Sequence, residues 1–157
     1  MLIALALALQ AVRLVLPLPQ PVSTFVIGSL VHMMLVLTWK LSGLGTALLL
    51  ALLLPLTAYL QGQVLLPLLI PVIWAGNVLF VVLLQLFSAN RRLALFLPPL
   101  AKAVLMGVAA WCVVNIVALP NPALRKTIMF GMSVPQLVTA FIGIWLARQV
   151  FLRIGKF

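Results

Sequence analysis

The feature that most constrains this chain is the uncharged, largely apolar run from Val64 to Phe87, VLLPLLIPVIWAGNVLFVVLLQLF. At ~1.5 Å per residue, a helix of this length reaches roughly 36 Å, which exceeds the ~30 Å hydrocarbon thickness of a bilayer. We therefore predict a tilted membrane span. Pro67 and Pro71 remove backbone donors from its first half. Gly76 and Asn77 lie near its middle, where no water would satisfy a carboxamide.

Asn77 therefore needs a partner inside the protein, and two interpretations remain open. In the first, the prolines kink the span and Asn77 hydrogen-bonds a neighbouring helix. In the second, Trp74 and Asn77 share a helix face, because they are three residues apart, and they line a cavity formed by several helices.

The composition of the whole chain extends this prediction to all of it. Hydrophobic residues make up 66% and charged residues 6% of the 157 residues, and the mean hydropathy is +1.37. These values are typical of an integral membrane protein. We predict an all-α fold, a single transmembrane domain over residues 1–157 that forms one helix bundle.

The charge balance excludes several kinds of function. The chain has ten Lys and Arg residues and no Asp or Glu. Because the basic residues fall at span ends, they indicate topology and contact with anionic lipid rather than nucleic acid. Without carboxylates the chain has no carboxylate general base, no carboxylate-bound magnesium site and no proton relay of acidic residues. One histidine and one cysteine cannot form a zinc site or an internal disulfide. We expect no enzyme activity, metal or cofactor.

Proline clusters, a tight polar turn and adjacent basic residues divide the chain into six predicted spans. A signal peptide competes for the first, but it has no basic start, and Arg13 lies where a cleavage region should be small and neutral. In the fifth span we expect the inserted helix to begin near Pro98 and Pro99. The predicted spans are approximately 2–16, 22–39, 44–60, 64–87, 93–119 and 127–151.

Alternating these spans across the bilayer separates the basic residues unequally. The side with more of them holds Lys40, Arg91, Arg92, Arg148, Arg153 and Lys156, and the other side holds Arg125 and Lys126. By the positive-inside rule, both termini are then cytoplasmic. The predicted outward loops are 17–21, 61–63 and 120–126.

The first helix has two different faces. Ala4, Ala8 and Ala11 share one side, and Gln10 and Arg13 share the opposite side. Small residues four apart allow another helix to approach closely, either within the bundle or in a partner. Gln10 and Arg13 must face protein or water.

Two basic side chains in later spans also have two interpretations each. His32 is either an interior hydrogen-bonded histidine or a ligand contact. Lys102 either snorkels back to the interface or points into the bundle. Gln136 shares a face of the last span with Thr139 and Gly143.

The pattern resembles the substrate-binding S component of energy-coupling factor (ECF) transporters, which are bacterial vitamin importers. The likeness covers nearly the whole chain and includes six spans in this length and Ala4-x-x-x-Ala8 on the first helix. The motifs in order are PLPQPVSTFVIGSLVHMML at 17–35, PVIWAGNVL at 71–79 and SVPQLVTAFIGIWLA at 133–147. The first span and the outward loops are shorter than that pattern leads one to expect.

The resemblance implies a binding subunit for a vitamin or micronutrient in the bacterial plasma membrane. Such a subunit tilts after it docks on a transmembrane coupling subunit, which two ATPase subunits drive. It implies that Ala4, Ala8 and Ala11 face the coupling subunit. The residues expected to bind substrate are Gln10, Arg13, His32, Gln61, Trp74, Asn77, Lys102 and Gln136. We expect an anionic group of the substrate at Arg13 and an apolar part near Trp74.

The alternative function is a structural or scaffolding membrane protein that resembles the six-span rod-shape-determining protein of the bacterial wall machinery. Such a protein needs outer helix faces but no cavity. The two hypotheses differ in where Arg13, Asn77, Lys102 and Gln136 point. A binding subunit would bring them to one outward-open cavity, whereas a scaffold would leave them in separate helix seams.

Overall fold

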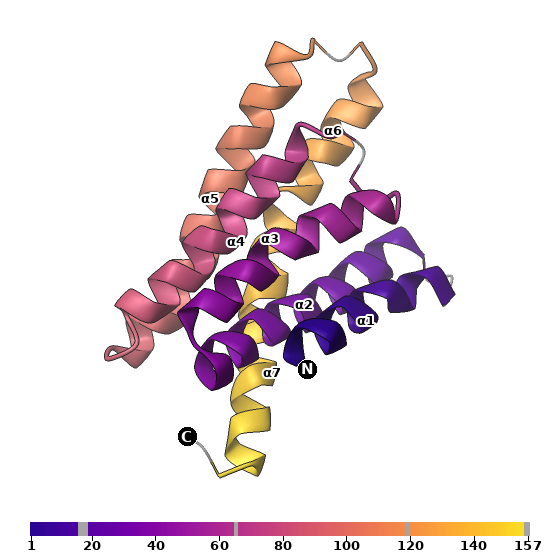
Figure 1. Ribbon diagram of the computed structural model, residues 1–157. Coiled ribbons are helices and arrows are strands. Elements are labelled where there is room, and N and C mark those ends of the chain that lie inside the picture. Colours follow the sequence, from indigo (N-terminus) through magenta and orange to yellow (C-terminus); the bar gives the residue numbers. More distant parts are fainter. Residues whose placement is uncertain (16–18, 65, 119, 156–157) are drawn as a thin grey trace.

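The computed structural model describes residues 1–15, 19–64, 66–118 and 120–155. Within these ranges the chain is all-helical and contains no strand (Figure 1). The helices are α1 (Leu2–Val15), α2 (Gln20–Ser42), α3 (Leu44–Leu60), α4 (Leu69–Leu86), α5 (Arg91–Ile116), α6 (Pro122–Gly131) and α7 (Val134–Arg153).

Four stretches are long and apolar enough to cross a membrane, as the composition predicted for this class of protein. They are Val22–Ser42, Leu69–Leu86, Arg91–Ile116 and Pro122–Arg153, of which the last joins α6 and α7. Helices α1 and α3 are also apolar but shorter. Helix α3 has the bounds that the sequence predicted for the third span.

The predicted span 64–87 is wrong in its first part. Helix α4 begins at Leu69, after a turn in which Leu69 N donates to Leu66 O at 2.9 Å. Pro67 therefore precedes the helix, and Pro71 lies in its first turn. A missing N–H has no cost in the first turn, because those donors have no partner within the helix. The two prolines start this helix rather than kink it.

The prediction for Pro98 and Pro99 is also wrong. Helix α5 begins at Arg91, where the Asn90 side chain caps it by accepting from Leu93 N at 3.2 Å. It continues through both prolines, which are buried, to Ile116. The Asn90 cap stabilises the first turn, which precedes both prolines, so the prolines lie inside the helix.

The predicted last span, 127–151, is two helices rather than one. Asn121 caps α6 by accepting from Ala123 N at 2.9 Å and Leu124 N at 3.2 Å, so most of the predicted loop 120–126 is helical. The helix ends at Gly131, and α7 starts at Val134 with Pro135 in its first turn. The proline has no N–H to continue the ladder of α6, which explains why the helix breaks here.

Helix α2 lies at the centre of the packing, with its most extensive contact against α7 and further contacts to α1, α3 and α4. Helices α4 and α5 run side by side (Figure 1). Helix α1 contacts only α2 and α3 among the described elements. Along α4, Asn77 falls between Leu69, which belongs to a smaller apolar cluster, and Phe80, which belongs to the main core. Asn77 and Lys102, which hydrogen-bonds it, are polar groups buried at this level.

Candidate ligand-binding cavity

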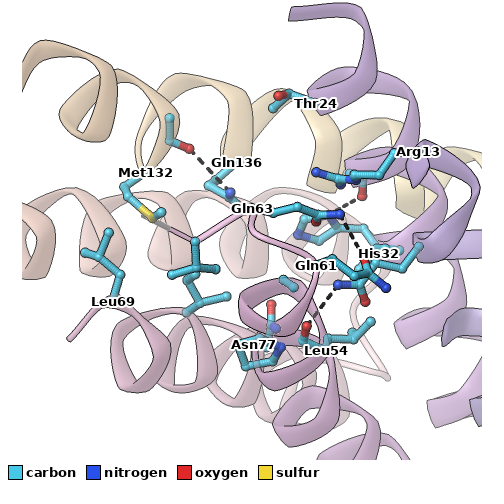
Figure 2. A pocket seen from close by; sticks show the side chains of 18 of the residues that line it. Arg13, Thr24, His32, Leu54, Gln61, Gln63, Leu69, Asn77, Met132 and Gln136 are labelled. Atoms are coloured by element: carbon cyan, nitrogen blue, oxygen red, sulfur yellow. Dashed lines mark hydrogen bonds between the residues drawn. The ribbon is translucent and has the colours of Figure 1, made fainter. Parts of the chain in front are cut away.

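A cavity of about 660 Å³ lies among the helices, and every helix contributes to its lining. Its wall includes the turn 61–64, the end of α1 and the start of α2, which lie at the same end of the bundle. Figure 2 shows Arg13, Gln63, Gln136 and Asn77 around this space. Its polar lining residues are Gln10, Arg13, Thr24, His32, Gln61, Gln63, Asn77, Lys102, Thr127 and Gln136.

The deepest polar group of the cavity is Lys102, whose side chain is 1% exposed. Its Nζ lies 2.7 Å from His32 Nε2 and donates to Asn77 Oδ1 at 2.6 Å. We call Lys102, His32 and Asn77 the Lys102 cluster. Its members come from α5, α2 and α4, so the cluster joins three helices. Lys102 points into the bundle, and the snorkelling interpretation is wrong.

Hydrogen bonding fixes the tautomer of His32 in the Lys102 cluster. His32 Nδ1 lies 2.7 Å from Gly28 O. A carbonyl oxygen can only accept, so Nδ1 carries the proton. In the neutral ring, Nε2 is then an acceptor, and Lys102 Nζ donates to it. Lys102 Nζ has three bonding positions besides its own side-chain carbon and uses two of them on His32 and Asn77, so one position remains for a ligand.

Asn77 is oriented by a proline in a different helix. Pro55 lies inside α3 and has no N–H to donate to Ala51 O, the carbonyl four residues earlier. The Asn77 carboxamide donates to that carbonyl through Nδ2 at 3.5 Å. With Nδ2 on Ala51, Oδ1 points to Lys102. Each interpretation of Asn77 is therefore correct in part, since Asn77 hydrogen-bonds a neighbouring helix and lines a cavity, but no proline kinks its helix and Trp74 is not in the lining.

Phe80 closes the apolar side of the Lys102 cluster. Its ring is fully buried and meets the His32 ring edge-on at a centroid distance of 5.3 Å. Lys102 Nζ lies 5.8 Å from the Phe80 centroid, within reach of a cation–π contact. Gly76 leaves room for the neighbouring Met106, because a Cβ there would lie 2.7 Å from Met106 Cγ.

Gln10 is anchored to α3 on another part of the wall. Its Nε2 donates to Leu54 O at 3.1 Å, and its Oε1 accepts from Thr57 Oγ1 at 3.1 Å. The side chain is 3% exposed. Since both ends of the amide are held, Gln10 also fixes the position of α1 against α3.

Arg13 lies one helical turn beyond Gln10 and also lines the cavity. Its Nε is buried and has no hydrogen-bond partner in the part of the chain that the structure describes. A buried guanidinium nitrogen without a partner is costly, so it is available for a ligand.

Three glutamines surround the same end of the cavity. Gln63 Nε2 donates to Gln61 Oε1 at 2.7 Å in the turn after α3. Gln136 Nε2 lies across the α6–α7 break, 3.4 Å from Gly131 O. Together they give the cavity neutral donors and acceptors in addition to its two basic side chains.

The structure brings together seven of the eight residues that the sequence suggested for substrate. They are Gln10, Arg13, His32, Gln61, Asn77, Lys102 and Gln136. Their role in binding stays a prediction. Trp74 does not line the cavity and is 42% exposed. The stripe that faces inward is Leu69, Ile73 and Asn77, four residues apart, and Trp74 lies about 100° around the helix from Ile73. The prediction that Trp74 shares the cavity is wrong.

Sequence reasoning missed three polar lining residues, Gln63, Thr24 and Thr127. Gln63 could have been found, because it forms one polar turn with Gln61. Thr24 lies in the second turn of α2 and Thr127 in the middle of α6, and nothing in their local sequence distinguishes them from other helical threonines.

On α1, Ala4 and Ala8 are exposed on the outside of the bundle and Ala11 is half-buried, whereas Gln10 is buried.

Among the residues that the structure describes, no group of His, Cys, Asp and Glu side chains could hold a metal ion. The chain matches no protein-family model, no curated protein and no solved structure.

Proposed function

We propose that this protein is the substrate-binding membrane subunit of an ECF-type importer for a vitamin or micronutrient in a bacterial plasma membrane. The observation that carries the proposal is the convergence of Arg13, Asn77, Lys102 and Gln136, from four different helices, on one cavity. A cavity of about 660 Å³ is within the ~300–1,000 Å³ range of small-molecule sites. A scaffold would need no such cavity.

The ligand is a small organic anion. Arg13 and Lys102 both line the cavity, and the chain has no carboxylate side chain to balance them. A carboxylate or phosphate on the ligand supplies the opposite charge, which stabilises basic groups buried within a membrane. The glutamine amides bond the neutral polar part of the ligand, and its apolar part lies on Leu69, Ile73 and Met132.

Transport in this proposal takes its energy from partners. The bundle has six spans with both termini in the cytoplasm, and the cavity lies at the outward end. A transmembrane coupling subunit docks on the exposed Ala4 and Ala8 of α1, and two ATPase subunits drive it. Close approach of a partner helix is possible there because the side chains are small.

Native mass spectrometry of the gently purified protein tests this function. The expected result is a retained small molecule that the Lys102→Met variant loses and the Lys126→Met variant keeps. Lys126 is the matched control because it lies on α6 outside the cavity lining. Copurification with a coupling subunit and ATPases tests whether partner subunits supply the energy for transport. Recovery with wall-synthesis proteins, and no retained molecule, would favour the scaffolding function instead.

A further inference from the structure

A second cleft lies at the other end of the bundle and shares no residue with the ligand cavity. Its volume is about 240 Å³. It is formed by the ends of α2, α4 and α7 and by the start of α5, and we call it the basal cleft. Its lining residues are Val36, Trp39, Lys40, Leu84, Ser88, Arg91, Ala94, Leu95, Ile144, Arg148 and Phe151.

The interior of the basal cleft is apolar. Val36, Leu84 and Phe151 are each at most 5% exposed and belong to the main hydrophobic core. Leu95 and Ile144 line it as well. These side chains offer hydrocarbon contact and no hydrogen bond, so they suit an acyl chain rather than a polar solute.

The rim of the basal cleft is basic. Lys40, Arg91 and Arg148 are exposed and line it, so three basic side chains surround one opening. Arg91 is the first residue of α5, so the partial positive charge of a helix N-terminus adds to the same potential.

A tryptophan marks the depth of this rim. Trp39 Nε1 donates to Gln85 Oε1 at 2.8 Å, and Lys40 Nζ lies 5.3 Å from the Trp39 ring centroid. Tryptophan and lysine together are typical of the headgroup level of a membrane. The basic rim is therefore at headgroup depth, and the apolar interior lies beside it.

We propose that the basal cleft binds one anionic phospholipid, with its phosphate on the basic rim and the upper part of an acyl chain on the apolar interior. Free phosphate would gain nothing from the apolar lining. A zwitterionic lipid would bring no net negative charge to three basic residues. This proposal does not depend on the transport function, because it uses a different site.

The experiment is native mass spectrometry after equilibration of the protein in mixed micelles of phosphatidylglycerol and phosphatidylcholine in equal amounts. We expect one phosphatidylglycerol to be retained by the wild type. The double variant Arg91→Gln, Arg148→Gln should lose retention by roughly 25-fold, since each basic residue near an anionic leaflet contributes about fivefold. The matched control, Arg125→Gln with Lys126→Gln, removes the same charge outside the cleft and should bind like the wild type.

A second variant tests the cleft itself without changing charge. Ala94→Trp fills part of the apolar interior and should also abolish retention, with thermal unfolding reporting that the bundle remains folded. Wild-type retention by Ala94→Trp, or an equal loss in both charge variants, would overturn the proposal. Displacement of the lipid by excess inorganic phosphate would overturn it too, because the rim alone would then be the site. A bound polypeptide in place of the lipid mass would assign the cleft to a protein partner.

Discussion

The seam between α2 and α7 and the outer face of α1 both carry small residues, but the bundle uses them differently. At the seam, a Cβ on Gly143 would collide with His32 Cβ and would lie 2.8 Å from Met33 N. A Cβ on Gly28 would lie 3.0 Å from Thr139 Cγ2. On α1, by contrast, Ala4 and Ala8 are exposed.

The comparison shows that small residues on a helix face can serve two purposes. Small residues let helices approach closely in a membrane, where there is little hydrophobic drive for helix association. At the α2–α7 seam this approach is already made, and it holds His32 and therefore the Lys102 cluster in place. On α1 the same kind of surface has no partner helix among the described residues, so it is open to another protein.

The largest effect on the bundle is expected for Gly143→Ala. The added methyl group would meet the His32 side chain and the backbone of Met33, so α2 and α7 must move apart. Overpacking of this kind costs roughly 1–3 kcal/mol or more. Thermal unfolding in detergent should show a clear loss of stability. The control is Gly45→Ala in α3, where a Cβ meets nothing within 4 Å. Equal stability of the two variants would mean that the seam is not tightly packed.

Lys102→Met should have the next largest effect, on ligand binding rather than on folding alone. It removes the donor to His32 Nε2 and Asn77 Oδ1 and one of the two basic groups of the cavity. A hydrogen bond to a charged group contributes about 1.5–3 kcal/mol, so affinity for the molecule retained by the wild type should fall roughly 10- to 150-fold. Isothermal titration with that molecule measures it. Unchanged affinity would confine the Lys102 cluster to a structural role.

Asn77→Ala should weaken binding by about tenfold, which corresponds to ~1.4 kcal/mol. The carboxamide links Ala51 O to Lys102 Nζ, so without it the lysine loses one of its two anchors. Asn115→Ala is the matched control, because Asn115 is exposed and bonds Arg125 outside the cavity. If thermal stability falls and affinity does not, Asn77 serves packing only.

The need of a polar residue in an apolar span for an interior partner could be predicted from the sequence because the physics is local, whereas convergence on one cavity was only one of two open outcomes. A 3.6-residue period assigns each side chain to a helix face, and a polar group in an apolar span must find a protein partner. Gln10 and Asn77 follow from that rule, whereas Lys102 does not, because a lysine with a long stem can also snorkel to the interface and the sequence left both positions open. The specific pairs do not follow, since they depend on which helices meet. Ala51 O receives Asn77 only because Pro55 lies beside it in space.

Helix boundaries were predicted less well, and prolines are the reason. A proline in a first turn and a proline inside a helix look alike in sequence, yet Pro71 is the first kind and Pro98 the second. The caps at Asn90 and Asn121 decide where α5 and α6 begin. Trp74 was misplaced because three residues along a helix leave 60° between side chains, and the inward stripe of α4 is narrower than the predicted face.

Arg13→Gln should affect ligand binding without a loss of stability, and its effect depends on the charge of the ligand. Arg13 Nε has no partner in the described chain, so its loss leaves no protein group unsatisfied and stability should hold. Affinity for an anionic ligand should fall by about tenfold, because a charge-assisted hydrogen bond is lost. Binding measured across candidate nutrients for both proteins would show this. A neutral or cationic ligand bound equally well by both would contradict the anionic assignment.

The smallest effect on the bundle itself is expected for the double variant Ala4→Leu, Ala8→Leu. Both positions are exposed on a helix that touches only α2 and α3 among the described elements, so the larger side chains meet no atom of the bundle. Thermal stability and ligand binding should stay as in the wild type. Recovery of the coupling and ATPase subunits in a pull-down should fall sharply, because leucines prevent close helix approach.

Val104→Leu with Val108→Leu is the matched control, since these two residues are also four apart and each is 58% exposed on α5. If both double variants assemble normally, α1 is not the docking helix. If both fail, the partner covers more of the bundle than one small-residue face, and the distinction drawn between α1 and the α2–α7 seam no longer locates the interface.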